Sequence, residues 1–416
     1  MEPRRLVVQK FGGTSVATAE GRRAMVERVR ERLGEGRQVV VVVSAMGRSG
    51  DPYATDTLIA LARREGPVDA RNLDLLMACG ETIAAVVAVG ALARGGIKAN
   101  ALTGAQAGII TDARHGDARV LRVEPGAILH NLDDGVVPVV TGFQGVSEAG
   151  EVTTLGRGGS DTTAAALGAA LAAELVEIFT DVDGIKTADP RIVPDARTLD
   201  TVTYEEVFQM AHQGAKVVHP RAVELAMRAG VPLRVRDARS SSPGTLIARA
   251  PAPEREWQRY ADIATGVTQR APVTLFRVAA GPGEEVRVFR PVADAGISVD
   301  LVNISPEVKS FTVLQEEADT VERVLKEHGF DPEVVRDCAK VSIVGSGVHG
   351  RPGVVAAMAE ALNEAGIAVL SSADSHITVS FLVPLSQMED AVRALHRKFG
   401  LAGRAAVLPD VEGGPA

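Results

Sequence analysis

The first part of the chain alternates short apolar runs with stretches of helical periodicity. Residues 39–43 are five consecutive valines, typical of a strand buried on both faces of a sheet, and residues 6–11 begin in the same way. Between them, residues 19–33 place apolar side chains at helical spacing among charged ones. Further apolar runs lie at residues 99–102, 135–141, 175–179 and 233–235. This alternation predicts an α/β fold with a mainly parallel sheet.

Polar residues and glycines gather where the predicted strands end. Lys10, Gly12 and Gly13 lie at the end of the first strand, and Ser44 follows the second. Because ligands of a parallel sheet bind beyond the carboxyl ends of its strands, we expect a ligand site at this edge.

The most informative segment spans residues 153–163. It passes through three glycines and Arg157 and then enters an alanine-rich stretch that predicts a helix, with Ser160, Asp161 and Thr162 as candidate N-caps. A helix N-terminus with an arginine beside it suits an anion. An ordinary capped connection explains the segment equally well, so this segment alone leaves both interpretations open.

Two acidic features are also open to two interpretations. Glu81 lies in the otherwise apolar helical stretch 73–92, where it is either exposed at a helix turn or buried with a partner, because an unpaired buried charge is costly. Asp181 and Asp183 follow the predicted strand 175–179 and are either metal or phosphate ligands or turn formers. Spacing alone slightly favours turn formers.

The last third of the chain repeats itself with a period of 70 residues. Ser310-Phe311 matches Ser380-Phe381, for example, and each copy predicts the order strand, helix, strand, strand, helix. Proline and charge concentrate just before the repeat and indicate a linker. We therefore expect a domain at residues 1–248, a linker at 249–262, and two α+β units at 263–338 and 339–416.

Composition narrows the function class. The 416 residues carry a formal net charge of −8 without a basic stripe, which argues against a nucleic-acid or anionic-membrane partner. The only two cysteines, Cys79 and Cys338, support neither a disulfide framework nor a zinc site. No signal-peptide pattern is evident and no apolar run approaches the length of a membrane span, so we expect a soluble, cytoplasmic protein.

Taken together, these segments resemble the monofunctional aspartokinases of the amino-acid kinase family. The resemblance runs essentially from end to end of the chain, and the repeated unit resembles a tandem of ACT domains. It implies an αβα sandwich with a mainly parallel sheet, followed by two α+β ACT units of βαββαβ order that act in regulation. The matching motifs lie at residues 10–16, 43–47, 79–81, 156–162, 179–184, 187–191 and 214–217.

The resemblance also implies an activity. Enzymes of this family transfer the γ-phosphoryl group of MgATP to the β-carboxylate of L-aspartate and form 4-phospho-L-aspartate and ADP. This is the first step towards lysine or diaminopimelate, threonine and methionine, and it is feedback-regulated. The resemblance implies ATP and Mg²⁺ as cofactors, with the metal held through the ATP phosphates and no protein ligand assigned. The alternatives are a kinase for glutamate or acetylglutamate, or a non-catalytic amino-acid sensor.

Site residues follow from the same resemblance. Lys10 is expected to reach the phosphates and Asp161 to orient it. Arg157 is expected to bind the α-carboxylate of aspartate and Glu81 its ammonium group, in a pocket formed by Thr55, Glu81, Phe143, Arg157, Gly158, Gly159 and Ser160. The expected ATP-binding residues are Lys10, Phe11, Gly12, Gly13, Ser44, Thr180, Asp181, Lys186, Arg191, Lys216 and Val217. Many relatives have a tyrosine in place of Lys186, so no stacking role is carried over to it.

Regulation is expected in the first repeat. Ser298, Val299 and Asp300 resemble the effector-binding segment of lysine-sensitive relatives, with Asp300 suited to an ammonium group. A plain strand with one exposed acid is the alternative. Lysine, threonine, both together or diaminopimelate remain open as effectors. Because ACT units usually pair across chains, the resemblance implies a homodimer or a larger homo-oligomer.

Overall fold

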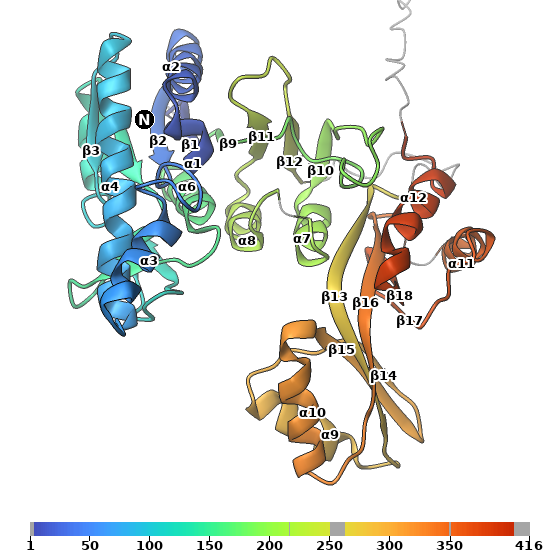
Figure 1. Ribbon diagram of the computed structural model, residues 1–416. Helices are drawn as coiled ribbons and strands as arrows, with labels where there is room; N and C mark the ends of the chain where they lie inside the picture. The colour runs from blue at the N-terminus through green and yellow to red at the C-terminus, as the bar shows by residue number, and fades with distance from the viewer. Residues whose placement is uncertain (1–3, 216, 250–262, 349–350, 403–416) are drawn as a thin grey trace, which may run out of the picture. The chain divides into compact units, whose positions relative to one another are not determined.

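A computed structural model describes residues 4–215, 217–249, 263–348 and 351–402 (Figure 1). Contacts divide the chain into two compact units. The first unit comprises residues 1–185, 198–211 and 216–253, and the second comprises 186–197, 212–215 and 254–416. Each unit is described by itself.

The first unit is built on an eight-stranded sheet in the order β10-β12-β11-β9-β1-β2-β6-β3. Neighbours pair in parallel except for the β11–β12 pair, which is antiparallel. The predicted mainly parallel α/β fold is therefore confirmed. The strands are β1 (Leu6–Phe11), β2 (Gln38–Val43), β3 (Ala99–Leu102), β6 (Val137–Thr141), β9 (Leu175–Thr180), β10 (Thr201–Thr203), β11 (Leu233–Asp237) and β12 (Thr245–Ala248).

Helices cover both faces of this sheet because its central strands are apolar on both sides. One face packs with α2 (Ala19–Gly34) and α4 (Ala70–Arg94) around a buried aliphatic core. On the other, α6 (Gly159–Ala170) contacts β1 and β9 and packs against α8 (Pro220–Ala229). Shorter helices are α1 (Gly13–Ala17), α3 (Thr55–Glu65), α5 (Gly126–Asp133) and α7 (Tyr204–His212).

Helix α4 corrects one sequence expectation. Among the described residues it is the one helix long and apolar enough to cross a membrane by length and composition, although no apolar run was expected to approach that length. Its buried residues include the acids Asp74 and Glu81, and it contacts β2, β3, β6 and β8. The long apolar stretch is therefore explained by packing inside the first unit.

A smaller four-stranded sheet, in the order β5-β4-β7-β8, belongs to the same unit. Its strand β8 leads directly into the turn that carries Arg157, and α4 packs against β8. The strands are β4 (Ile109–Thr111), β5 (Val120–Val123), β7 (Gln144–Ser147) and β8 (Val152–Thr154).

The second unit has one six-stranded sheet in the order β14-β15-β13-β16-β18-β17. The 70-residue repeat is confirmed, since β15, η2 and α10 recur one period later as β18, η3 and α12. In Figure 1, α9 and α10 accompany the first repeat and α11 and α12 the second. The elements are β13 (Gly266–Ala279), α9 (Glu285–Asp294), β14 (Asp300–Ile304), β15 (Val308–Leu314), η2 (Gln315–Glu317), α10 (Ala318–Glu327), β16 (Glu333–Val344), α11 (Val354–Glu364), β17 (Ser371–Asp374), β18 (Thr378–Pro384), η3 (Leu385–Gln387) and α12 (Met388–Lys398).

The two repeats share their central strands. The first half of β13, Gly266 to Arg270, pairs with the second half of β16, whereas its second half pairs with both β15 and the start of β16. The second repeat therefore takes one of its strands, Gly266 to Arg270, from the segment that begins the first repeat in the sequence. The expected division between residues 338 and 339 falls inside β16.

Residues 186–197 also pack within the second unit. Ile192 and Val193 join the buried core of the second repeat. Thr187 Oγ1 lies 3.0 Å from His396 Nε2 in α12, and Arg393 Nε of the same helix donates to the Ile192 carbonyl at 3.0 Å. This segment follows β9 and carries two of the predicted ATP-binding residues, Lys186 and Arg191.

Candidate active site

The ends of β1 and α6 bring together a lysine and an aspartate. Lys10 Nζ lies 2.8 Å from Asp161 Oδ1, and the two side chains are only 11% and 12% exposed. Behind them, the Phe11 ring stacks on Phe179 of β9 at a centroid distance of 4.6 Å. The Phe11 side chain is fully buried, so it supports the strand ends and leaves only its backbone for any ligand.

The two glycines after β1 lie close to the ends of the neighbouring strands, Gly12 to that of β9 and Gly13 to that of β2. A side chain at Gly13 would place its Cβ 2.4 Å from the Ala45 carbonyl oxygen, so only glycine fits there. The Gly12 amide donates to the Phe179 carbonyl at 3.2 Å and is therefore already engaged. The Gly13 amide, at the first position of α1, has no acceptor within its helix and is the one suited to a phosphate.

Helix α6 begins earlier than its sequence suggested. Ser160, Asp161 and Thr162 were expected as N-caps, but the cap is Gly158 in the left-handed conformation, with φ of 68°. Its missing side chain is needed there, because a Cβ would lie 2.2 Å from the His219 ring. Asp161 is consequently inside the first turn and free of capping, which lets it face Lys10.

A hydrogen-bonded chain links this turn to helix α4. Ser160 Oγ accepts from Ser44 Oγ at 2.9 Å, and the amide of the next residue, Ala45, donates to Glu81 Oε1 at 3.2 Å. Glu81 is 2% exposed, and its other carboxylate oxygen has no hydrogen-bond partner among the described residues. Of the two interpretations of Glu81, the buried one holds.

Burial has a chemical consequence for Glu81. It raises the pKa of this carboxyl to about 7, outweighing the hydrogen bond from the Ala45 amide. A buried carboxylate with one unpaired oxygen is costly unless a cation or donor completes it. The arrangement fits an ammonium group from a ligand.

The remaining residues of the predicted aspartate pocket lie around this chain. Phe143 has a positive φ of 69°, and its ring packs against Gly159, where a Cβ would come within 2.7 Å. The Arg157 side chain is exposed and has no hydrogen-bond or ion-pair partner in the described part of the chain. Thr55 begins α3, two residues after Tyr53, whose carbonyl oxygen would lie 3.0 Å from a Cβ at Gly80.

The predicted ATP-binding residues are more dispersed. Thr180 ends β9 and Asp181 follows it in the first unit, which also contains Val217. Lys186 and Arg191 belong to the second unit, where the 86% exposed Arg191 pairs with Asp189. Lys216 lies outside the described residues.

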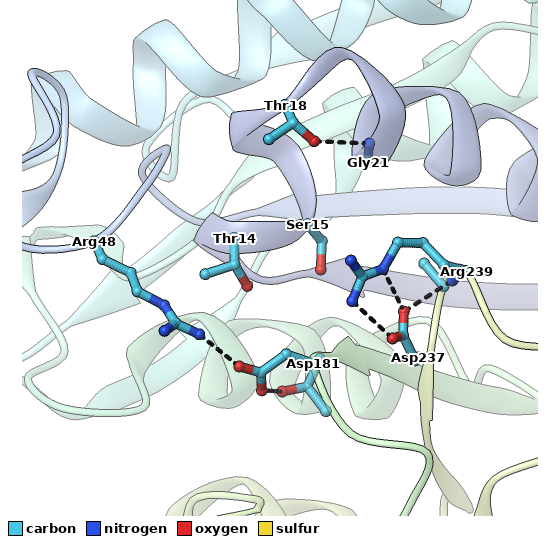
Figure 2. A pocket seen from close by; sticks show the side chains of 10 residues that line it. Thr14, Ser15, Thr18, Gly21, Arg48, Asp181, Asp237 and Arg239 are labelled. Atoms are coloured by element: carbon cyan, nitrogen blue, oxygen red, sulfur yellow. Dashed lines mark hydrogen bonds and ion pairs between the residues drawn. The ribbon is translucent and has the colours of Figure 1, made fainter.

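A cavity of about 150 Å³ opens at the strand ends of the first unit, and Figure 2 shows its lining. Arg48 pairs with Asp181 at 2.7 Å on one side, and Arg239 pairs with Asp237 at 2.9 Å on the other. Arg28 of α2 fixes the loop below by donating to the Ala238 and Ser240 carbonyls. The sequence interpretation missed Arg48, Asp237 and Arg239, although each follows or ends a strand at the predicted edge.

The predicted effector segment lies in the second unit. Ser298 is exposed and precedes β14, which begins at Asp300. Asp300 is not free, because Lys340 of β16 lies 2.6 Å from its carboxylate and is 5% exposed. Burial alone would raise the pKa of Asp300, but Lys340, the Leu301 amide and Arg270 together outweigh burial and lower the pKa overall.

Comparison with known proteins agrees with this geometry. The amino acid kinase family profile matches residues 5–237, and an ACT-domain profile matches residues 333–397. The chain is 48% identical over 402 residues to Aspartokinase 1 of Bacillus subtilis, covering 96% of this chain and 100% of that protein. The chain belongs to the aspartokinases of the amino acid kinase family. It is also 44% identical over 415 residues to the aspartokinase of Mycolicibacterium smegmatis, covering 96% and 97% of the two chains.

Solved aspartokinase structures share the fold. Aspartokinase III of E. coli in complex with aspartate and ADP, in the R-state, superposes with a TM-score of 0.76 at 26% identity, covering 94% of this chain and 99% of that one. The T-state of the same protein, in complex with lysine and aspartate, gives a TM-score of 0.72 at 27% identity, covering 95% and 99%. The predicted family and fold class are thus confirmed.

Proposed function

We propose that this protein is an aspartate kinase. It transfers the γ-phosphoryl group of ATP to the β-carboxylate of L-aspartate, giving 4-phospho-L-aspartate and ADP at the head of the pathway to lysine or diaminopimelate, threonine and methionine. The observation that carries the proposal is the buried chain from the Lys10–Asp161 pair through Ser160, Ser44 and Ala45 to Glu81. It supports a site in which a cation suited to phosphate and an orphan carboxylate suited to ammonium lie at one sheet edge.

The aspartate end of the site divides the recognition between two charges. Glu81 accepts the substrate ammonium with its unpaired oxygen, which also completes the hydrogen bonding of that buried group. Arg157, exposed and unpaired among the described residues, presents a planar fork to the α-carboxylate. Thr55, Phe143, Gly158, Gly159 and Ser160 shape the pocket. The β-carboxylate is then left to face Lys10.

At the phosphate end the protein supplies positioning and charge. Phosphoryl transfer requires little covalent chemistry, so neutralising the transferring group is the main task. Lys10 contacts the phosphates, Asp161 holds Lys10 in place, and the Gly13 amide, which has no acceptor within its helix, adds a donor. Mg²⁺ supplies further neutralisation when it is bound with ATP. A nearby carboxylate such as that of Asp161 suits a metal that takes most of its ligands from phosphates and water.

The nucleotide is expected to lie at the end of β9. Thr180 and Asp181 border the cavity of Figure 2, and Ser44 follows strand β2, which is separated from β9 by β1 in the sheet. Lys186, Arg191, Lys216 and Val217 complete the proposed set on the basis of family resemblance. Gly12 contributes by its small size, because its amide is engaged with Phe179.

For regulation we propose that residues 1–248 form the catalytic domain and that two ACT units, 263–338 and 339–416, bind a feedback amino acid at Ser298, Val299 and Asp300. An effector ammonium group at Asp300 has to share that carboxylate with Lys340 or displace it. The exposed β14 edge side chains Val302 and Ile304 support a homodimer or larger homo-oligomer. The two cysteines are free thiols, in keeping with a cytoplasmic enzyme.

Substrate preference tests the proposal. Purified protein with MgATP is given L-aspartate, L-glutamate or N-acetyl-L-glutamate, and ADP release and the acyl-phosphate product, trapped with hydroxylamine, are measured. The proposal expects turnover with aspartate and little with the other two. Preference for glutamate or acetylglutamate favours the other amino-acid kinases, and no turnover at all favours a sensor. Lys10→Met serves as the control for contaminating kinases.

A further inference from the structure

Asp74 of α4 is a fully buried carboxylate to which no role has been assigned so far. It is 0% exposed, and four donors surround it. Oδ1 accepts from Thr154 Oγ1 at 2.5 Å and from the Gly116 amide at 3.1 Å. Oδ2 accepts from the Thr154 amide at 3.1 Å and lies 2.9 Å from His115 Nδ1. These hydrogen bonds engage both oxygens of the buried carboxyl group and fix the two segments that carry the donors.

The donors belong to the two segments that frame the Arg157 turn. Thr154 is the last residue of β8, three positions before Arg157. Residues 115–117 lie against the turn itself, because a Cβ at Gly156 would be 2.8 Å from Asp117 Oδ1 and 3.2 Å from the Gly116 carbonyl oxygen. Asp74 therefore anchors both the strand that leads into the turn and the loop that supports it.

A second anchor reaches the same turn from α8. Arg221 donates to the Leu155 carbonyl at 3.2 Å and pairs with Asp117 at 2.7 Å. The turn is thus fixed at Thr154 and Leu155 on both sides, whereas the Arg157 side chain beyond it is exposed and unpaired among the described residues. A rigid base under a free guanidinium group is what a ligand-binding arginine requires.

We propose that Asp74 is a positioning residue for aspartate binding: by holding Thr154 and residues 115–116 it sets the position of the turn from which Arg157 binds the α-carboxylate. This inference rests on the proposed function of Arg157. It predicts that loosening the Asp74 contacts weakens the binding of aspartate and spares that of MgATP, since Lys10 lies on β1, whose end is supported by the stack of Phe11 on Phe179.

The strand β8 offers a matched pair of variants. Thr154→Val removes the hydroxyl donor to Asp74 and keeps the shape of the side chain. Thr153→Val is the control, because Thr153 is equally buried, loses a hydroxyl contact with Thr111 Oγ1 at 2.6 Å, and does not touch Asp74. We expect Thr154→Val to raise the KM for aspartate about 3–10-fold, with kcat and the KM for MgATP changed by less than about twofold. Thr153→Val is expected to lower Tm similarly and to leave the KM for aspartate unchanged.

Two further variants separate this inference from the proposed function. Asp74→Asn puts an NH2 group where a donor now points at the carboxylate, so a hydrogen bond is lost. We expect this variant to raise the KM for aspartate about tenfold or more. In an Arg157→Gln background, Thr154→Val is expected to add nothing, since both act through the same side chain. Equal KM values in Thr154→Val and Thr153→Val, or additive effects with Arg157→Gln, overturn the role of Asp74. An unchanged KM in Arg157→Gln alone overturns the proposed role of Arg157, and the inference falls with it.

Discussion

The aspartate half and the nucleotide half of the proposed site differ in how far they are preorganised before a ligand binds. The aspartate half has a buried, cross-linked centre: Glu81 and Ser160 are less than 10% exposed and are connected through hydrogen bonds. In the nucleotide half, Asp181 is exposed and paired with the exposed Arg48. The first half can recognise its ligand with little rearrangement, whereas the second must exchange its own ion pairs for those of a nucleotide.

This difference ranks the expected effects of substitutions. Buried groups with unsatisfied chemistry should matter most, and exposed ion pairs should matter least, because solvent screens them.

The largest effect is expected where the two halves meet. Lys10→Met or Asp161→Asn should lower kcat by about 10³-fold or more, because each removes or misplaces charge that stabilises the transferring phosphoryl group. Both variants should keep the wild-type fold by circular dichroism. A kcat within about tenfold of wild type in a folded variant would mean that this pair is not the phosphate site.

Glu81→Gln should produce the next largest effect, on aspartate alone. We expect the KM for aspartate to rise about 100-fold with a small change in the KM for MgATP. Since the pKa of Glu81 is about 7, the wild-type KM for aspartate should fall as pH rises from 6 to 8, and this dependence should vanish in the variant. Steady-state kinetics across this range provide the check, and a retained pH dependence assigns the titration to another group.

Glu81→Gln should weaken aspartate binding but increase the stability of the unliganded protein at high pH. The folded pKa of about 7 lies above the value of 4.5 expected for an unfolded chain, so the folded state binds more protons between these values. The stability that this proton provides is lost as pH rises through 7. Unliganded Glu81→Gln should therefore be more stable than wild type at pH 8, by about 1–3 kcal/mol, in urea unfolding. Lower stability than wild type at that pH contradicts the orphan-carboxylate account.

In the second unit, Asp300→Asn should leave kcat unchanged and weaken feedback inhibition about tenfold. The equivalent position in the second repeat is Leu370, which has no charge to offer, so the two repeats differ in this respect. Inhibition curves with lysine, threonine, both together and diaminopimelate measure the effect and identify the effector. Unchanged inhibition with every one of them places the effector elsewhere.

The smallest effect is expected for Arg48→Ala at the rim of the nucleotide half. Arg48 is 70% exposed, and its ion pair with Asp181 is accessible to solvent. We expect the KM for MgATP to change by no more than about threefold, and the KM for aspartate not at all. A larger change in the KM for MgATP would show that the nucleotide half is also preorganised before the nucleotide binds.

Sequence reasoning proposed the residues of the aspartate half but not the hydrogen bonds that connect them. The strand ends at Lys10 and Ser44 and the glycine turn before Asp161 follow from local patterns. The burial of Glu81 does not, because an acid in an apolar helix is buried or exposed according to what packs on it. Asp74 was not recognised from the sequence, because its hydrogen-bond donors on Thr154 and Gly116 are distant from it in sequence.

The repeats show a similar limit. A period of 70 residues predicts two copies of one fold, but it does not reveal that β13 pairs in both, since strand exchange leaves no trace in the spacing. The N-cap of α6 was misplaced because Ser160 and Asp161 are favourable caps in isolation. Contact between Gly158 and His219, residues distant in sequence, starts the helix earlier.

The central claim is that Glu81 is a buried carboxylate with one unpaired oxygen, and that this oxygen binds the ammonium group of aspartate. Calorimetric titration of aspartate into the enzyme with ADP at pH 7, in buffers of different ionisation enthalpy, counts the protons released on binding. The account predicts release of about half a proton per site, because a group with a pKa near 7 becomes fully ionised, and no release in Glu81→Gln. Binding without proton release in the wild-type enzyme would contradict it.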